Sequence, residues 1–339
     1  MLHLITGGSG FIGTLIARRL RDRGDQVRII DIRDDASRPP EIEFVQGSVM
    51  DRDAVARAMT GVDIVHHNAA LVAQSAAGRR YWDVNLTGTQ TVAEEAAKAN
   101  VRGIIHLSTT AVFGLPPHGP ITAATVPAPI EDYGKSKLAG ERAMQAVCDR
   151  AAIPLLTIRP RVTLGAGRLG IFQILFEWIR DGRTVPVIGD GRQKQQFIHV
   201  SDLTDFYMFA LERGVSGAFN VGTDRFGTLR EDLEALIRHA GSPSRVRGLP
   251  VWPAIQALRL LHAMRMSPLT PWHYRTYHRD TYFDTQPLTA LGWKPRYSNL
   301  DMLTESYDWY LANQQAGDGA SPHRSGLGQG FLRVVKALS

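Results

Sequence analysis

Tyr133 and Lys137 are the residues of this 339-residue chain whose types and spacing most directly suggest acid–base chemistry. They lie four positions apart, and at the start of a helix this spacing puts both side chains on one face. A tyrosine near its reference pKa of about 10 is a poor acid or base at neutral pH, but a nearby ammonium group favours the phenolate. The pair therefore predicts proton transfer. The alternative is that both residues simply face solvent on a helix, which would give the same spacing.

A glycine-rich segment near the N-terminus has the pattern of a dinucleotide-binding turn. Gly7, Gly10 and Gly13 follow an apolar run and open an amphipathic segment that begins with Phe11 and Ile12. In a strand–turn–helix context, glycines let the backbone pass close to a pyrophosphate, and the helix N-terminus stabilises its negative charge. The segment therefore predicts a cofactor-binding turn.

Asp31 ends the second apolar run, 18 residues after the last of these glycines. A carboxylate at this position accepts hydrogen bonds from the adenosine ribose and repels a 2′-phosphate. The sequence therefore favours NAD(H), while Arg33, two residues further on, leaves NADP(H) open.

Short apolar runs alternate with helical patterns through the first half of the chain, which predicts right-handed β-α-β units. The fold class that follows is α/β, a Rossmann doubly wound parallel sheet with a smaller mixed α/β C-terminal substrate lobe. Strands are expected at Leu2–Ile5, Val27–Ile30, Phe44–Val45, Asp63–His67, Ile104–Leu107 and Leu155–Ile158, with later returns to the sheet at Phe197–Val200 and Ala218–Val221. Helices are expected near 11–23, 51–60, 81–99, 134–150 and 171–180.

The same patterns predict how the chain divides. Residues 1–165 are expected to form the Rossmann NAD(P)-binding domain, with its sheet completed by about 195–222. Residues 166–194 and 223–312 form the substrate-binding lobe, and 313–339, rich in Gly, Ser and Gln, form a flexible basic tail.

The order of motifs along the chain resembles the extended, or atypical, short-chain dehydrogenase/reductase superfamily and its NAD-dependent epimerase/dehydratase family. The resemblance runs from residue 1 to about 310. Besides the glycine turn, Asp31, Tyr133 and Lys137, it depends on Asn68-Ala69-Ala70, Asn85, Ser108-Thr109-Thr110, Arg159-Pro160, Phe197-Ile198-His199-Val200 with Asp202, and Phe219-Asn220-Val221-Gly222.

The resemblance implies a role for each matching residue. Thr109 would hydrogen-bond the reacting oxygen, Tyr133 would exchange its proton, and Lys137 would tune Tyr133 and hold the nicotinamide ribose. Asn85 would support them, and Ser48 stands where an Asp often contacts adenine. The residues expected to bind the cofactor are Gly7, Gly10, Phe11, Ile12, Gly13, Asp31, Ser48, Val49, Asn68, Ala69, Ala70, Asn85, Tyr133, Lys137 and Pro160. A homodimer through helices near 85–99 and 134–150 is also implied.

The choice of reaction depends on a few substitutions relative to the superfamily pattern. Related sugar 4,6-dehydratases carry Asp-Glu after the catalytic Thr, but this chain has Thr110 and Ala111, which argues against dehydration. Nucleotide-sugar enzymes usually have an Arg where Gln195 stands and an Asn near Val162. Because a diphosphate normally takes charge-assisted partners, these changes argue against a nucleotide sugar. Arg161, Arg168 or Arg192 could compensate.

The C-terminal half is similar to the 3β-hydroxysteroid dehydrogenase-like branch, which handles sterols and other apolar alcohols or ketones. Residues 251–266 fit an amphipathic helix, either facing the core or covering an apolar substrate or membrane surface. We expect a secondary alcohol and a ketone to be interconverted on a bulky apolar substrate, such as a keto-lipid of sphingolipid or ceramide type or a sterol-like molecule. A nucleotide-sugar 4-epimerase is the alternative, and a non-catalytic cofactor-binding scaffold is a third possibility.

Composition limits the remaining function classes. Hydrophobic residues make up 44% and charged residues 21% of the chain, as in a soluble globular enzyme. A single cysteine, Cys148, excludes an internal disulfide framework, and no signal peptide or membrane-spanning run is evident. We therefore expect a cytoplasmic protein. The formal charge of +6 and the short basic, apolar segment 331–338 leave contact with a membrane surface open.

No nucleic-acid partner and no metal are expected. The chain has no basic block with interleaved aromatic residues. His66 and His67 are adjacent on a predicted strand, so their side chains point to opposite faces and cannot bind one metal ion.

Overall fold

Seven strands form the main sheet, in the order β10-β6-β5-β4-β1-β2-β3. The structure is a computed structural model, and it describes residues 1–73, 77–115, 119–170, 172–264 and 271–313. Pairing is parallel from β6 through β3, and the order reverses between β1 and β4. The predicted Rossmann sheet is thereby confirmed. Its strands are β1 (Leu2–Thr6), β2 (Gln26–Asp31), β3 (Glu43–Gln46), β4 (Ile64–His67), β5 (Gly103–Leu107), β6 (Leu155–Pro160) and β10 (Gly217–Val221).

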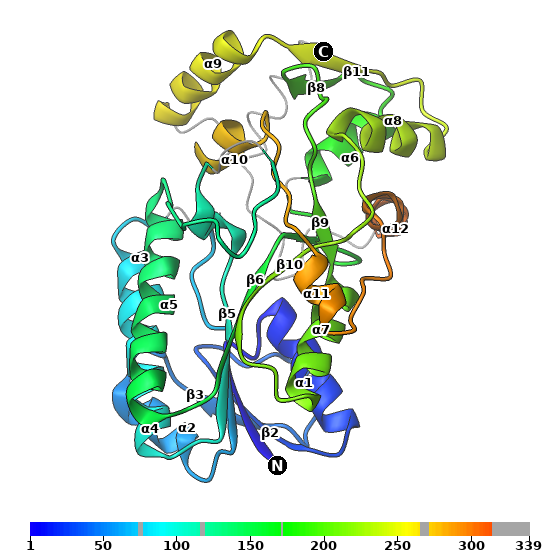
Figure 1. Cartoon of the computed structure of the whole chain (residues 1–339). Coiled ribbons are helices and arrows are strands. Elements are labelled where there is room, and N and C mark those ends of the chain that lie inside the picture. The colour runs from blue at the N-terminus through cyan, green and yellow to red at the C-terminus, as the bar shows by residue number, and fades with distance from the viewer. Residues whose placement is uncertain (74–76, 116–118, 171, 265–270, 314–339) are drawn as a thin grey trace. The chain divides into compact units, whose positions relative to one another are not determined.

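Helices cover both faces of this sheet (Figure 1). The helices α2 (Arg52–Met59), α4 (Thr89–Lys98) and α5 (Asp132–Ala151) lie on one face, with α1 (Phe11–Asp22) and α7 (Val200–Glu212) on the other. The core under the first group is aliphatic and fully buried, since the strands of a parallel sheet are covered on both faces.

The predicted helix 81–99 consists of three segments rather than one regular helix. A short helix, α3 (Arg80–Trp82), leads into a π-helical segment, η2 (Asp83–Gly88), and then into α4. A π-helical turn inserts extra backbone into a helix and is frequent at functional sites.

Contacts within the chain define two compact units. Of the described residues, unit 1 contains those within 1–113, 126–160 and 204–220, and unit 2 contains the others. Segment 114–125 therefore belongs to unit 2, although it falls inside the predicted domain 1–165. Apart from Asn313, the predicted tail 313–339 lies outside the described residues.

Unit 2 has its own apolar core and two small sheets. Phe172, Phe176, Leu233 and Tyr307 are among the buried side chains that form this core. The elements are β7 (Val162–Leu164), α6 (Phe172–Arg180), β8 (Val185–Ile188), β9 (Phe197–His199), α8 (Leu229–His239), β11 (Val246–Leu249), α9 (Val251–Ala263), α10 (Pro271–Thr276), α11 (Gln286–Ala290) and α12 (Asn299–Ala312).

One predicted strand belongs to a different sheet from the one expected. The sequence placed Phe197–Val200 in the main sheet, but β9 pairs in parallel with β7 in a separate two-stranded sheet. The prediction for Ala218–Val221 is correct, because β10 is the edge strand of the main sheet. A short apolar run shows that a segment is buried but not which strand it pairs with.

No helix among the described residues is both long and apolar enough to cross a bilayer.

Four buried histidines lie in or beside the parallel strands. His66 contacts His3 and Tyr207, and His67 contacts Thr6 and Thr89, so the two neighbours point to opposite faces as expected. Burial lowers the pKa of His67 to about 3 and that of His3 to about 4. It also lowers the pKa of His66 and His106 well below the usual value. The sheet is therefore built around neutral imidazoles.

We predict that acid destabilises the protein because these histidines must charge on unfolding. Unfolded histidines titrate near 6.5 and the folded ones far lower, so their contribution is complete above pH 6.5 and is lost as the pH falls. From pH 7.5 to 5.5 each should lower the free energy of unfolding by roughly 1 kcal/mol. Asp232, whose pKa burial raises to about 6, acts in the opposite direction, as does Asp202, whose pKa burial also raises. Urea denaturation at both pH values measures the change.

His106→Leu provides the matched variant. Both ring nitrogens of His106 lack a hydrogen-bond partner among the described residues, so an apolar side chain should be tolerated. The variant should be at least as stable at pH 7.5 and lose less stability at pH 5.5. An unchanged pH dependence in this variant would contradict the explanation.

Candidate active site

The residues predicted to bind cofactor and catalyse the reaction lie in unit 1, most of them at or just after the carboxyl ends of parallel strands, with Asn85 on η2 and Tyr133 and Lys137 on α5. Gly7 follows β1, Asp31 ends β2, Asn68 follows β4, Thr109 follows β5 and Pro160 ends β6. Because parallel strands end at the same edge of a sheet, this edge collects side chains that are far apart in the sequence.

The glycine turn is closed tightly by its own backbone. Gly7 has φ +67°, and a Cβ there would lie 2.8 Å from the Cα of Ala69. A Cβ on Gly13 would lie 2.4 Å from the carbonyl oxygen of Gly7. The turn thus packs directly against the start of α1 and the segment after β4, and only glycine fits at both positions.

The N-terminus of α1 is open to an anion. Its N-cap, Gly10, makes no side-chain hydrogen bond, and Phe11, Ile12 and the rest of the first turn include no acidic residue. By contrast, Asp51 caps α2 and Thr228 caps α8 through their side chains. A helix N-terminus without a carboxylate carries a partial positive charge, which suits a pyrophosphate.

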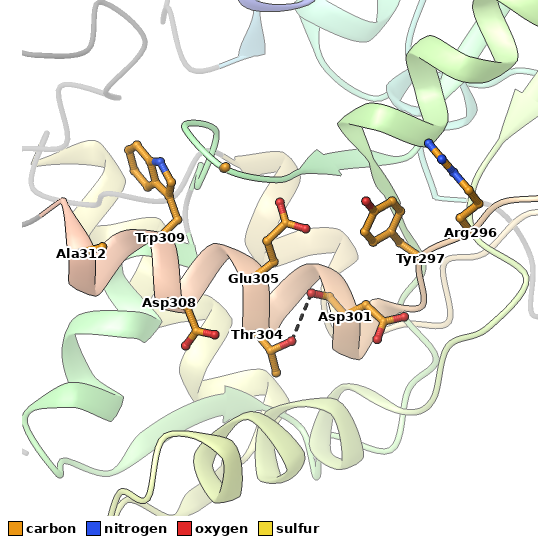
Figure 2. A pocket seen from close by; sticks show the side chains of 9 residues that line it. Arg296, Tyr297, Asp301, Thr304, Glu305, Asp308, Trp309 and Ala312 are labelled. Atoms are coloured by element: carbon orange, nitrogen blue, oxygen red, sulfur yellow. Dashed lines mark hydrogen bonds between the residues drawn. The ribbon is translucent and has the colours of Figure 1, made fainter.

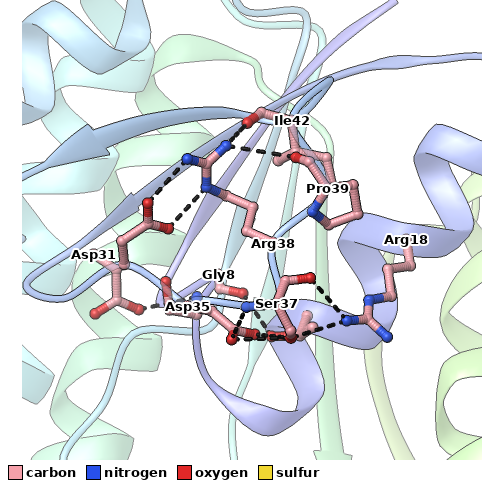
Figure 3. Close-up of polar contacts among 11 residues, drawn as sticks. Gly8, Arg18, Asp31, Asp35, Ser37, Arg38, Pro39 and Ile42 are labelled. Atoms are coloured by element: carbon pink, nitrogen blue, oxygen red, sulfur yellow. Dashed lines mark hydrogen bonds and ion pairs between the residues drawn. The ribbon is translucent and has the colours of Figure 1, made fainter.

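Asp31 is held beside this turn (Figure 3). Its Oδ2 accepts a hydrogen bond from the backbone N–H of Ser9 at 3.1 Å, and its Oδ1 accepts from Ile32 N–H at 2.7 Å. In the following loop, Arg38 pairs with Asp34 and Arg18 donates to Ser37. Arg38 thus has a carboxylate partner within the loop, Arg18 reaches the loop from α1 through its Nη2, and the carboxylate of Asp31 is fixed against the glycine turn.

Ser48 and Val49 lie between β3 and α2. Ser48 Oγ accepts a hydrogen bond from Met50 N–H at 3.2 Å, so its hydroxyl can still donate. Val49 packs against Gly88, where a Cβ would lie 2.6 Å from Val49 Cγ2.

Lys137 is 98% buried on α5, and its Nζ donates a hydrogen bond to the carbonyl oxygen of Leu107 at 2.8 Å. Burial lowers the pKa of this ammonium group to about 8, and the carboxylate of Glu141, one turn further along α5, counteracts part of that shift. Glu141 also accepts hydrogen bonds from Nε and Nη2 of Arg159. A cation is therefore fixed one helical turn from Tyr133.

Two glycines in α5 let this helix approach the neighbouring segments. A Cβ on Gly134 would lie 2.5 Å from the carbonyl oxygen of Ala111, in the short helix η3 (Thr110–Phe113) that follows Thr109. A Cβ on Gly140 would lie 2.2 Å from the carbonyl oxygen of Asn85 in η2. The close approach brings the helix that carries Tyr133 onto the segments that carry the other predicted residues.

Asn85 and Ser136 link these segments through hydrogen bonds. Asn85 bonds both backbone groups of Leu71, and its Nδ2 also donates to Ser136 Oγ at 3.2 Å. Ser136 Oγ in turn donates to the carbonyl oxygen of Tyr133 at 2.9 Å. Sequence reasoning missed Ser136, as well as Glu141 and Tyr81, whose ring centroid lies 5.9 Å from that of Tyr133. Of these three residues, only Glu141 could have been predicted from the sequence, because it lies four residues after Lys137.

A hollow of about 760 Å³ lies elsewhere, along α12 in unit 2 (Figure 2). None of the predicted site residues lines it. Its carboxylates already have structural partners: Asp301 bonds Ser298 at the start of α12, Glu305 contacts His199, and Asp308 contacts His239. We therefore do not assign the chemistry to this hollow.

Comparison with known proteins identifies the family. The model of the NAD dependent epimerase/dehydratase family matches residues 3–222. The chain belongs to this family. It is therefore an NAD-dependent enzyme of the extended short-chain dehydrogenase/reductase type, as the motifs predicted.

Several relatives and solved structures resemble this family member along most of its length. An uncharacterized protein, y4nG, from Sinorhizobium fredii is 38% identical over 98% of this chain and 85% of its own length. A 4-hydroxy-2-methyl-3-oxo-4-farnesyl-3,4-dihydroquinoline-1-oxide ketoreductase from Stigmatella aurantiaca is 28% identical over 96% of this chain and all of its own. The crystal structure of Thermus thermophilus UDP-glucose 4-epimerase in complex with NAD has a TM-score of 0.73 at 24% identity, covering 92% and 99% of the two chains.

The residues of unit 1 fit the family's cofactor. Within the described part of the chain, Ser9 Oγ, both side-chain polar atoms of Asn68, and Ser108 Oγ are buried without a hydrogen-bond partner. They follow β1, β4 and β5 at the edge that the predicted cofactor residues share. Buried polar atoms without partners are costly unless a ligand or water satisfies them, so these groups suit a polar ligand along this edge.

We predict that Gly140→Ala destabilises this enzyme by forcing α5 away from η2. The added methyl group would meet a backbone oxygen that cannot rotate aside, and overpacking of this kind costs about 1–3 kcal/mol. Thermal unfolding should show a melting temperature lower by several degrees. Gly103→Ala is the control, because its nearest neighbours lie 3.6 Å away. Equal melting temperatures for the two variants would contradict the packing argument.

We predict that Asp31→Ser changes cofactor selectivity. Loss of the carboxylate removes a charged hydrogen-bond acceptor, so the Kd for NADH should rise roughly tenfold or more, and loss of repulsion should lower the Kd for NADPH. Titration calorimetry with both cofactors measures the ratio without any substrate. Asp22→Ser, which removes an exposed carboxylate, should leave both constants unchanged. An NADH/NADPH ratio equal to that of the wild type would refute the role of Asp31.

Proposed function

We propose that this enzyme interconverts a secondary alcohol and a ketone with net hydride transfer, on a bulky apolar substrate without a diphosphate. The observation that carries the proposal is the bonding of Gln195 and Gln196. Gln195 Nε2 donates to the carbonyl oxygen of Arg279 at 2.8 Å, and Gln196 bonds both the N–H of Phe283 and the carbonyl oxygen of Thr223. Both glutamines are buried in unit 2 and tie neighbouring backbone together.

This bonding bears on the substrate because Gln195 stands where nucleotide-sugar enzymes usually carry an arginine. A neutral amide engaged with backbone offers no charge to a diphosphate. Arg161, one of the arginines that could compensate, is itself buried: its Nε donates to the carbonyl oxygen of Gln196 at 2.9 Å, and its guanidinium lies 5.3 Å from the ring centre of Phe283. The similarity to a ketoreductase whose named substrate carries a farnesyl group supports the same choice.

The proposed chemistry uses three side chains of unit 1. In the reducing direction a reduced nicotinamide, when bound, would supply a hydride for the carbonyl carbon. Tyr133 gives the proton of its phenol to the carbonyl oxygen, so that a ketone, a hydride and a proton yield the secondary alcohol. Thr109 Oγ accepts from Ala111 N–H at 3.2 Å, which leaves its own hydrogen to orient the substrate oxygen. The ammonium group of Lys137 stabilises the phenolate that remains.

A nucleotide-sugar 4-epimerase is the second candidate, favoured by the similarity in fold to UDP-glucose 4-epimerase. It would use the same three residues but regenerate its cofactor in each turnover. The proposal has three further parts. The C-terminal half is similar to the 3β-hydroxysteroid dehydrogenase-like branch, and the substrate is a keto-lipid of sphingolipid, ceramide or sterol type. The enzyme forms a homodimer through helices near 85–99 and 134–150.

The two candidates predict different cofactor balances. With a keto-lipid as substrate, the purified enzyme should oxidise NADH in proportion to the alcohol formed, followed by the absorbance of the reduced nicotinamide. Interconversion of a UDP-sugar pair with no net change in that absorbance would overturn the reductase proposal in favour of the epimerase. A protein that binds NADH but turns over neither substrate would be a scaffold.

We predict that Tyr133→Phe and Lys137→Met each lower turnover by about a hundredfold or more, because general acid–base catalysis contributes that much. NADH binding by Tyr133→Phe should stay close to that of the wild type, measured by calorimetry. Lys135→Met is the matched control, because Lys135 lies on the same helix but is exposed. Full turnover in the Tyr133 variant, or equal losses in both lysine variants, would refute the assigned chemistry.

A further inference from the structure

Residues 235–279 form the longest acid-free, arginine-rich part of unit 2. Between Glu234 and Asp280 the sequence contains no Asp, Glu or Lys but seven arginines, at 238, 245, 247, 259, 265, 275 and 279. This is unusual in a chain with 33 acidic residues among 339. A span of this kind creates a local positive potential that attracts anions.

The same span carries a cluster of exposed apolar side chains on β11 and α9. Trp252 is 73% exposed, Leu260 62% and Met264 50%, and Leu249 and Val251 are also exposed. These are five of the twelve large hydrophobic side chains that are exposed in the described part of the chain. Trp252 and Leu260 are eight residues apart on α9, which puts them about 80° apart around the helix, and Met264 follows the last residue of α9. We call these five residues the α9 stripe.

Exposed arginines flank the α9 stripe. Arg245 and Arg247 are exposed at β11, and Arg259 is exposed on the same side of α9 as Trp252, because seven residues make about two turns. Near this strand, Asp190 lies next to Gly248 and is 3.7 Å from Arg192, so it is already beside a cation. The surface therefore combines an apolar stripe with a positive border.

We propose that the α9 stripe docks on an anionic membrane surface. A helix of 13 residues is about 20 Å long and too short to span the hydrocarbon core, but it can lie in the plane of the interface with its apolar side chains among the acyl chains. Arginines at its border then meet the negative headgroups. The proposal concerns a surface of unit 2 and holds whatever the substrate of the enzyme is.

The positive charge of this surface favours an anionic membrane over two other binding partners, a second copy of the chain and the C-terminal segment 314–339. A second copy of the chain would bring the same arginines against this surface. The C-terminal segment 314–339 contains Arg324, Arg333 and Lys336 against a single acidic residue, Asp318, so it has the same sign as the surface. An anionic lipid surface complements both the stripe and its border.

Vesicle co-sedimentation with the full-length protein tests the proposal. We expect binding to phosphatidylcholine vesicles that contain about 30 mol% phosphatidylglycerol, roughly tenfold or more weaker binding to pure phosphatidylcholine, and release by about 0.5 M NaCl. The double variants Trp252→Ser/Leu260→Ser and Arg245→Gln/Arg247→Gln should each bind at least about tenfold more weakly. Circular dichroism checks that both variants are folded.

Two control variants match these changes elsewhere. Val126→Ser removes an apolar side chain that is 79% exposed, and Arg57→Gln removes an exposed cation. Both should bind vesicles as the wild type does. Equal loss of binding in the controls would overturn the assignment to the α9 stripe.

Other outcomes would also overturn the proposal. These are no binding to the anionic vesicles at low salt, equal binding to neutral vesicles, or full binding by both double variants. A dimer in light scattering that Trp252→Ser/Leu260→Ser dissociates would assign the stripe to a second copy instead. Retention on heparin without any vesicle binding would assign the surface to another polyanion.

Discussion

The buried ammonium group of Lys137 is the constraint on which the arrangement of unit 1 depends. A charge that is removed from water must be hydrogen-bonded and balanced, or it costs several kcal/mol. The carbonyl oxygen of Leu107 and the carboxylate of Glu141 satisfy these needs, and Arg159 holds Glu141 in turn. Burial keeps the nearby imidazoles neutral. The positive charge is therefore concentrated at one atom, one turn from Tyr133.

The rest of unit 1 fixes the backbone around that charge. Buried hydrogen bonds connect the end of β1 to the start of α5 through side chains that are distant in sequence. The connection runs through Thr6, His67, Thr89, Asn85, Ser136 and the carbonyl group of Tyr133. Because each group in a buried polar network satisfies its neighbour, a shift of one segment leaves several partners unpaired. The glycine turn and α5 are thus held by one network.

Unit 2 uses polar side chains for a different purpose. Asn299 donates to the carbonyl oxygen of Gln195 and to Asp232, and its Oδ1 accepts from the N–H of Phe197. Asp202 accepts from the N–H groups of Arg296 and Tyr297. These groups hold backbone segments together, whereas the charged side chains that are exposed around α9 face solvent. In the proposed function, unit 1 supplies the catalytic side chains, and Gln195 in unit 2 is the difference that bears on the substrate.

Local patterns in the sequence determined the glycine turn, Asp31, the Tyr133–Lys137 pair and most strands of the main sheet, because turn chemistry and hydrophobic periodicity depend on neighbouring residues. They did not determine the pairing of β9 with β7, the π-helical segment around Asn85, or the exposed face of α9. The pairing of β9 depends on a second strand, and the π-helical segment depends on the helix that approaches it at Gly140. The exposed face of α9 depends on the absence of a covering element among the described residues. Ser136 and Glu141 were missed for the same reason, since their importance follows from what they contact in the folded chain. The sequence by itself predicted which groups react, and only the tertiary structure decided which contacts hold those side chains.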